Sequence, residues 1–244
     1  MSALARIFRH PIKSHGRESL ERVTLVAGQT MPLDRRWAVA HEAARLEGTG
    51  WAPCANFSRG SKAPGLMAIE SEMRGERIAL RHPELGEIEI DPDSDGDRLV
   101  EWTRPLIPEG RARSARVIRA EGQGMTDYPD SALSIASLAS HHAVEARIGH
   151  PLAIERWRMN LWIDGTEAWE EFGWQGRRLR IGAVLFEIGE RVERCMATTA
   201  NPATGERDAD TLAALRSFGH QDLGVYAICV VGGDVAVGDP VVVE

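Results

Sequence analysis

The stretch VYAICVVGGDVAVGDPVVVE, residues 225–244, carries the strongest fold signal in the sequence. Apolar, valine-rich runs alternate here with the pair Gly232-Gly233 and then with a Gly-Asp-Pro turn. Runs of β-branched residues separated by glycine and proline are typical of consecutive strands joined by tight turns. The C-terminal stretch therefore predicts strand, turn, strand, turn, strand.

Further strands extend this pattern toward the N-terminus. Residues 179–188 predict a strand that carries Val184, Phe186 and Ile188 on one face, and residues 152–157 predict another. In roughly the first half of the chain, the alternation in GERIALRH indicates half-buried strands separated by turns such as HPELG and TRPLIPEG. The acidic segment DPDSDGD lacks the glutamate that closes a calcium loop and is interpreted as a turn.

Two helices are expected among these strands. The first is predicted over residues 134–148, with Ser134 as its N-cap and Gly149 as its end, and the second over residues 208–218. Residues that recur at helical spacing in the first helix are Ile135, Leu138, Ala139, His142 and Ala146. The adjacent His141 and His142 point to different sides and are interpreted as surface or packing residues. In the second helix, Leu212 and Leu215 are expected to face inward. Many strands and few helices predict a β-barrel-rich α+β fold. The segment Gly122-Gln123-Gly124 suits a joint between two subdomains, 1–122 and 123–244.

Composition excludes several classes of protein. With 43% hydrophobic and 27% charged residues, the 244-residue chain can bury a full core. The net charge of −7 argues against general nucleic-acid binding. No apolar run approaches the roughly 20 residues of a membrane span, and MSALARIFRHPIKS lacks the apolar core of a signal peptide. We therefore expect a cytoplasmic protein with no membrane partner.

The cysteines differ in their surroundings. Three thiols cannot all pair, so they are expected to be reduced. Cys229 lies in an apolar run and Cys54 in a loop, and neither carries a signal of function. Cys195 stands beside Arg194 and before a polar turn, a setting that favours the thiolate that attacks or ligates. The absence of a CxxC motif argues against a zinc site. The absence of the GxGxxG and GxxxxGK[ST] motifs argues against a Rossmann or P-loop nucleotide-binding fold.

Several basic residues stand at expected strand ends and turns. An anionic ligand would suit these residues if folding brought them together: Lys13-Ser14, Arg35, and Arg158, which stands two positions before Asn160. Spacing alone leaves open whether they converge or are separately solvated.

Seven motifs in order resemble the MOSC domain family, including its N-terminal β-barrel extension. They cover nearly the whole chain: HPIKS, LDRRWAV, TDYPDSALSIASL, RWRMN, EEFGWQGRRLRIG, RCMATTANPATGE and LGVYAICVVGGDVAVGDPVVV. Asn201 stands where the family has aspartate, and Thr126-Asp127-Tyr128 stands for its usual Asp-Thr-Ser. The resemblance implies a β-barrel subdomain over 1–122 and a MOSC domain over 123–244.

The resemblance also implies a cofactor and its ligands. Cys195 would ligate molybdenum, which suits a soft thiolate, and Asp127 would assist catalysis by relaying protons. The residues implied to hold the molybdopterin or to shape the loop beside the metal are Lys13, Ser14, Arg35, Thr126, Tyr128, Arg158, Asn160, Thr198 and Thr199.

The function implied is the reduction of N-hydroxylated or N-oxide compounds. Because the chain has no cysteine set for an iron–sulfur cluster, electrons would come from a separate ferredoxin, flavoprotein or cytochrome. Two alternatives stay open at this point. One is a carrier of the cofactor or of sulfur, and the other is a β-barrel binding protein without metal.

Overall fold

The computed structural model describes residues 1–48, 50–130 and 132–244 and has an α+β architecture dominated by strands. The strands of the described residues are β1 (Ala3–Arg9), β2 (Glu18–Leu20), β3 (Arg22–Leu25), β4 (Trp37–His41), β5 (Glu70–Arg74), β6 (Arg77–His82), β7 (Gly86–Ile90), β8 (Ser114–Arg119), β9 (Leu133–Ser137), β10 (Leu161–Asp164), β11 (Arg178–Ile181), β12 (Val184–Glu193), β13 (Asp222–Val231), β14 (Gly233–Ala236) and β15 (Val241–Val243). The α-helices are α1 (Gly96–Thr103), α2 (Leu138–Ile148) and α3 (Thr211–Arg216).

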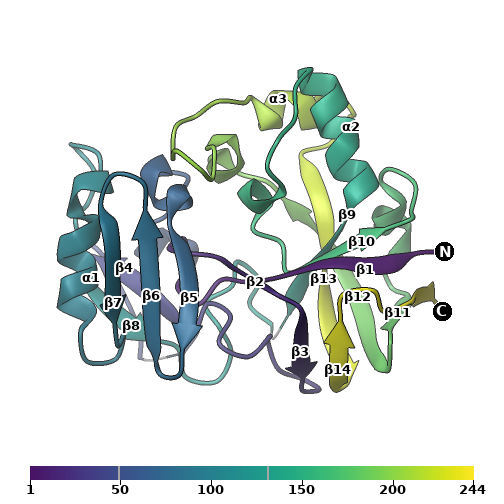
Figure 1. Cartoon of the computed structure of the whole chain (residues 1–244), viewed down its shortest axis with the longest axis horizontal. Helices are drawn as coiled ribbons and strands as arrows, with labels where there is room; N and C mark the ends of the chain where they lie inside the picture. The colour runs from purple at the N-terminus through teal and green to yellow at the C-terminus, as the bar shows by residue number, and fades with distance from the viewer. Residues whose placement is uncertain (49, 131) are drawn as a thin grey trace.

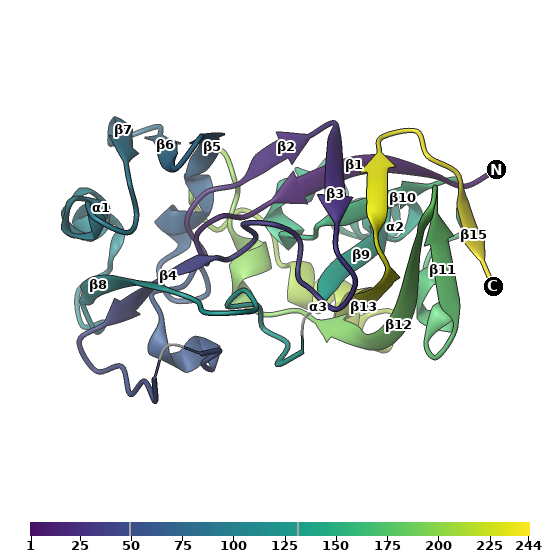
Figure 2. The same ribbon diagram turned by 90° about the horizontal axis from the view of Figure 1, so that it is seen from below.

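One large sheet joins the two ends of the chain. Its strand order is β15-β11-β12-β13-β9-β10-β1-β2, and only the β9–β10 pair is parallel among the described strands. The N-terminal strand β1 pairs with β10, and β3 pairs with β14 near the C-terminus, as Figure 2 shows from below. Two of the first three strands, β1 and β3, therefore pair with strands of the C-terminal half.

A second body of structure lies on the left of Figure 1. It contains the two-stranded sheet β4–β8, the sheet β5-β6-β7 and helix α1, which packs on β8 and β7. Its core includes Trp37, Leu66, Ile78, Leu80 and Leu99. Ile78 and Leu80 are buried from one face of β6, as their alternation with charged residues predicts.

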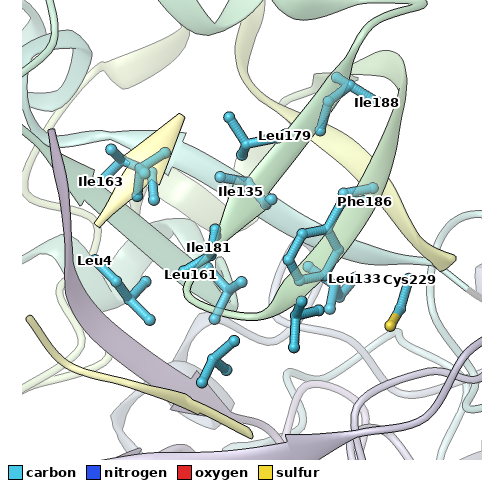
Figure 3. Close-up of a cluster of buried hydrophobic side chains, with 14 of the residues drawn as sticks. Leu4, Leu133, Ile135, Leu161, Ile163, Leu179, Ile181, Phe186, Ile188 and Cys229 are labelled. Atoms are coloured by element: carbon cyan, nitrogen blue, oxygen red, sulfur yellow. The ribbon is translucent and has the colours of Figure 1, made fainter. Parts of the chain in front are cut away.

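The large sheet curls around an apolar core. Leu4, Ile135, Leu161, Ile181 and Phe186 come from five strands and point toward one another in Figure 3. On the other side, α2 packs beside α3 and against β9 and β10 over a second cluster that includes Val144, Trp157 and Leu215. Leu212 and Leu215 are buried, as the sequence predicts for the second helix.

Four secondary-structure predictions require correction. The strand predicted over residues 179–188 is a hairpin of β11 and β12, because the chain reverses in a turn at residues 182–183. Residues 152–157 form no strand but end in a 3-10 helix, Ile154–Trp157. The first helix starts at Leu138, because residues 133–137 form β9, which is buried on both faces and so lacks a strand's alternation. An eight-residue helix, α1, follows the acidic turn where no helix was expected.

The helix cap changes accordingly. The Ser137 hydroxyl, not Ser134, accepts from the backbone N–H of Ala139 at 3.1 Å, while Gly149 ends the helix in the left-handed conformation as predicted. His141 is a buried packing residue and His142 is an exposed surface residue. The buried His141 ring has a hydrogen-bond partner in the Trp157 indole, whose Nε1–H donates to His141 Nδ1 at 3.0 Å. Among the described helices, none is long and apolar enough to cross a bilayer.

Candidate functional site

A cavity of about 1090 Å³ opens at one end of the large sheet. Its walls come from segments far apart in the sequence: the turn after β1, the loop before β5, the segment leading into β9, the turn before β10, and the end of β12 with the loop beyond it. A volume near the upper end of the usual range for ligand pockets suits a large ligand. The cavity is therefore the strongest candidate for a binding site among the described residues.

Ten of the eleven site residues implied by the sequence line this cavity. They are Lys13, Ser14, Arg35, Thr126, Asp127, Tyr128, Arg158, Asn160, Cys195 and Thr198. Thr199 does not line it; its hydroxyl donates to the Met196 carbonyl at 2.8 Å and accepts from Arg207. Thr199 thus helps to fold the loop beyond Cys195.

Strained backbone marks the same site. Ser14, Arg35 and Arg158 have φ values of 61°, 49° and 53°, in the left-handed region that non-glycine residues seldom adopt. Such conformations persist where the surrounding structure enforces them, and they concentrate at functional sites. Three separate turns therefore bear a conformational cost to direct these side chains toward the cavity.

Lys13 and Asp127 form a bridge on the cavity wall. The ammonium Nζ donates to Asp127 Oδ1 at 2.6 Å and to the Met125 carbonyl at 2.7 Å. Burial lowers the pKa of Lys13, and the Asp127 carboxylate opposes that shift. The Lys13 ammonium holds the pKa of the largely exposed Asp127 carboxyl below its ordinary value. The carboxylate is therefore ionised at neutral pH and has no proton to donate.

The guanidinium groups of the site carry more positive charge than their neighbours neutralise. Arg35 bonds to Asp34 and to the Arg158 carbonyl, while Arg158 Nη1 bonds to the Gly16 carbonyl at 3.1 Å. Arg158 Nη2 and Arg194 Nε are buried with no hydrogen-bond partner among the described residues. Burial and the neighbouring Arg35 lower the pKa of Arg158 to about 9. An anion in the cavity would satisfy these donors and relieve that electrostatic penalty.

Asn160 acts within the protein. Its Oδ1 accepts from the backbone N–H and the hydroxyl of Ser134 at 3.1 and 3.0 Å, and its Nδ2 donates to the Phe8 carbonyl at 3.2 Å. The amide therefore ties β9 and β1 together beneath the cavity. Since these contacts use most of its hydrogen-bonding capacity, Asn160 shapes the site more than it can bind a ligand.

Cys195 is exposed and caps the 3-10 helix Met196–Thr199. Two bonds fix the turn after it: Thr198 Oγ1 donates to the Cys195 carbonyl at 3.1 Å, and the buried Arg156 donates to the Thr198 carbonyl at 3.1 Å. Arg156 also forms an ion pair with Asp208, Nη2–Oδ1 3.1 Å. A thiol on a braced turn at a cationic cavity is suited to hold a soft metal.

Sequence reasoning missed several residues of the cavity. Cys54, interpreted as incidental, lines it and accepts a bond from Arg59 Nη1 at 2.9 Å. Tyr226 lines it and stacks on Tyr128 with ring centroids 4.5 Å apart. Cys54 lies in no motif, whereas Tyr226 lies within LGVYAICVV, a motif that was interpreted only as closing strands. For Arg156, the pair of arginines in RWRMN was a signal, but only Arg158 was singled out.

On α2, a cluster of His141, His142 and Glu145 contains residue types that can ligate a metal ion. The Trp157 indole donates to His141 Nδ1, so the proton of the neutral ring lies on Nε2, which faces Glu145 at 3.4 Å. A metal on Nε2 would require that proton to move to Nδ1 and break the tryptophan bond. The cluster is therefore a hydrogen-bonded helix face.

Comparisons with known proteins identify two family domains. The "MOSC N-terminal beta barrel domain" matches residues 1–116, and the "MOSC domain" matches residues 122–242. Molybdenum cofactor sulfurase of Drosophila ananassae is 29% identical over 163 residues, which are 61% of this chain and 20% of that protein. Mitochondrial amidoxime-reducing component 1 of Xenopus laevis is 24% identical over 259 aligned positions, covering 85% of this chain and 71% of that protein.

Other relatives are matched over shorter parts. Mitochondrial amidoxime reducing component 2 of Macaca fascicularis is 33% identical over 158 residues, 59% of this chain and 46% of that protein. The chain thus spans about a fifth of the length of the sulfurase and about half of this reductase. Among solved structures, the YUAD protein from Bacillus subtilis aligns with a TM-score of 0.47 at 13% identity, covering 100% of this chain and 96% of that one.

Proposed function

The chain belongs to the MOSC domain proteins that carry the MOSC N-terminal beta barrel domain, and from this premise we propose that it binds the molybdenum cofactor and reduces N-hydroxylated or N-oxide compounds. The observation that carries the proposal is the convergence of ten residues, from segments remote in sequence, on one cavity with unsatisfied buried guanidinium donors. When bound, the cofactor supplies the two-electron chemistry that removes oxygen from the substrate.

The donor set fits this cofactor. A phosphorylated pterin carries negative charge and hydrogen-bond acceptors, and the cavity offers Lys13, Arg35 and Arg158 as cations. Arg158 Nη2 and Arg194 Nε lack partners among the described residues and would gain them from such a ligand. Cys195 supplies the thiolate for the metal. The overall charge of −7 does not oppose this, because the positive charge is local.

Each residue of the site has a distinct role in this proposal. Lys13, Arg35 and Arg158 bind the phosphate and pterin. Ser14 contributes a hydroxyl, and the backbone at Thr126 forms part of the cavity wall. Asp127 holds the Lys13 ammonium in place, a role that suits its ionised carboxylate better than proton donation. Thr198 and Arg156 position the Cys195 turn. Electrons come from a separate ferredoxin, flavoprotein or cytochrome.

Elemental analysis tests the proposal. The wild type and Cys195→Ala are expressed in cells that make the cofactor, and molybdenum and pterin are measured per chain. We expect about one molybdenum per wild-type chain and loss of the metal in Cys195→Ala. Cys229→Ala is the matched control, because that thiol lies in the apolar core. Cys195→Ala with undiminished molybdenum would refute the ligand assignment.

Turnover is measured on the same preparations. With reduced methyl viologen as electron donor, the wild type should convert benzamidoxime to benzamidine and Cys195→Ala should not. Molybdenum-loaded protein that reduces no amidoxime, hydroxylamine or N-oxide would exclude the reductase while leaving cofactor binding intact.

A second candidate function is a carrier of sulfur or of the cofactor. The observation that favours it is the presence of two thiols, Cys54 and Cys195, on the wall of one cavity. A sulfur carrier treated with a persulfide donor should gain one sulfur in mass on Cys195 and pass it to an acceptor protein. Failure to load or to transfer sulfur would remove this candidate.

A further inference from the structure

The cavity has a second wall whose chemistry differs from that of its cationic side. Tyr128, before β9, and Tyr226, on β13, stack with ring centroids 4.5 Å apart and planes inclined by 25°. Both rings line the cavity that contains Cys195. Tyr226 is within electrostatic reach of Asp127 and of Arg194, the residue that precedes Cys195. The aromatic pair therefore lies close to the proposed reaction centre.

Gly189 on β12 lies beside this pair. A Cβ at Gly189 would lie 4.0 Å from the Tyr128 hydroxyl and 3.6 Å from the Tyr226 carbonyl. The Tyr128 hydroxyl therefore lies beside β12 at Gly189, the one residue of that strand without a side chain. The rings keep their neutral form, since burial raises the pKa of Tyr226 to about 12 and also raises that of Tyr128.

A carboxylate accompanies the rings. Glu190 follows Gly189 on β12, lines the cavity, and is close enough to Tyr128 to contribute to the raised pKa of its hydroxyl. Among the described residues no cation forms an ion pair with the Glu190 carboxylate. Its neighbour Arg191 is turned toward Phe172, with its guanidinium carbon 4.2 Å from the ring centroid, and toward Asp222. Glu190 thus presents an unneutralised negative charge to the cavity.

We propose that Tyr128, Tyr226 and Glu190 form a specificity subsite that favours planar, conjugated N-hydroxylated compounds with a basic head group over aliphatic or neutral ones. The inference rests on the proposed reductase function. Aromatic faces attract flat conjugated groups and cations. A carboxylate accepts hydrogen bonds from the N–H groups of an amidoxime and pairs with the two N–H donors of the amidinium that its reduction yields.

The reaction that such a substrate undergoes is balanced. An amidoxime takes two electrons from the external donor and two protons from water, its N–O bond breaks, and water and an amidine leave. The amidine then binds one more proton and becomes a planar cation. The subsite should therefore recognise the product directly, which allows binding to be measured without turnover.

The test compares three probes on the molybdenum-loaded protein by isothermal titration calorimetry. Benzamidine is planar and cationic, acetamidine is cationic without a ring, and benzamide has the ring without the charge. We expect wild type to bind benzamidine about tenfold more tightly than either of the others. Equal affinity for benzamidine and acetamidine would overturn the aromatic part of the proposal, and equal affinity for benzamidine and benzamide would overturn the acidic part.

Variants assign the preference to residues. Tyr128→Leu should abolish the preference for benzamidine over acetamidine, whereas Tyr128→Phe, which keeps the ring, should retain it. Glu190→Gln should abolish the preference for benzamidine over benzamide. Glu187→Gln is the matched control, because Glu187 is exposed on the same strand, pairs with Arg178 and does not line the cavity. Unchanged preferences in Tyr128→Leu and Glu190→Gln would assign the selectivity elsewhere.

Turnover separates this inference from the proposed function. If wild type reduces benzamidoxime and acetamidoxime with equal kcat/KM, the reductase stands and the subsite is refuted. If neither is reduced but the amidine preferences and their loss in the variants are observed, the subsite stands as a binding site and the reductase is refuted.

Discussion

The Lys13 ammonium lies 2.6 Å from the Asp127 carboxylate, although 114 positions separate the two residues in the chain. Lys13 follows β1 and Asp127 precedes β9, so the bridge forms only when the N-terminal strand has joined the sheet of the C-terminal half. The Lys13 side chain is 5% exposed and that of Asp127 is 65% exposed. The cation is therefore held by the fold, while the anion stays partly hydrated.

Lys13→Met should lower pterin retention about tenfold or more, because it removes a charge-assisted hydrogen-bond donor while keeping a long apolar side chain. Asp127→Asn should lower retention less than Lys13→Met, because the ammonium remains but is held less firmly. It should also lower the stability of the empty protein, since the nearly buried ammonium loses its counter-ion. Pterin fluorescence after oxidative release measures the first effect, and urea denaturation the second. Lys62→Met is the control, because Lys62 is exposed and lies off the cavity wall. Normal pterin content in Lys13→Met would contradict its role.

The pair Arg156–Asp208 should matter far more to stability than its bond length suggests. Its N–O distance of 3.1 Å equals that of Arg178–Glu187, but the Arg156 side chain is 1% exposed and the Arg178 side chain 56%. Asp208→Asn leaves a buried guanidinium without a counter-ion and should cost about 3 kcal/mol. Glu187→Gln should cost less than about 1 kcal/mol. Urea denaturation of both variants tests this, and equal costs would show that burial of Arg156 is irrelevant.

Local patterns predicted those elements whose residues alternate between core and solvent. Ile78 and Leu80 on β6 and Leu212 and Leu215 on α3 are buried as expected. The prediction failed at β9, where burial of both faces leaves no period to distinguish a strand from the helix that follows. It failed again at 152–157, where the chain turns sharply into Arg158 in the left-handed conformation.

The site was predictable in its motifs but not in its geometry. The order of seven motifs singled out ten residues that line one cavity. Yet nothing local signals that Ser14, Arg35 and Arg158 adopt positive φ, because such strain is imposed by long-range packing. Cys54 was missed because it lies in a loop outside every motif. Tyr226 lies within the last motif, but the strand pattern there does not show that its ring lines the cavity.

Two glycines with positive φ should respond very differently to alanine. Gly149, with φ 93°, ends α2 in open space, so Gly149→Ala should cost only the strain of the left-handed conformation, about 1 kcal/mol. At Gly224, with φ 79°, a Cβ would also lie 2.3 Å from Met159 Cε and 2.6 Å from the Ile135 carbonyl oxygen. Overpacking should raise the cost of Gly224→Ala to about 3 kcal/mol or more. Thermal unfolding of the pair checks this, and similar losses in Tm would contradict it.

Acidification should weaken the fold between about pH 6.5 and pH 4. Burial lowers the pKa of His10 to about 3 and those of His15 and His141 to about 4, from an ordinary value of 6.5. In this window the unfolded chain binds protons that the folded chain does not, so stability falls as pH falls, by roughly 2 kcal/mol per histidine at pH 5. The shift of Asp34 acts only below its ordinary pKa of 3.8 and does not contribute there.

A variant of one histidine tests the source of this slope. Since the glutamine side chain keeps an acceptor for the Trp157 indole, His141→Gln should fold. It should reduce the loss of stability between pH 7 and pH 5 by roughly 2 kcal/mol, because one of the buried rings with a lowered pKa no longer titrates. His142→Gln, at the exposed neighbour, should leave the slope unchanged. Urea midpoints across the range measure it. A slope that persists in full in His141→Gln would assign the acid sensitivity to other groups, because the buried imidazole of His141 is the titrating group that this substitution removes.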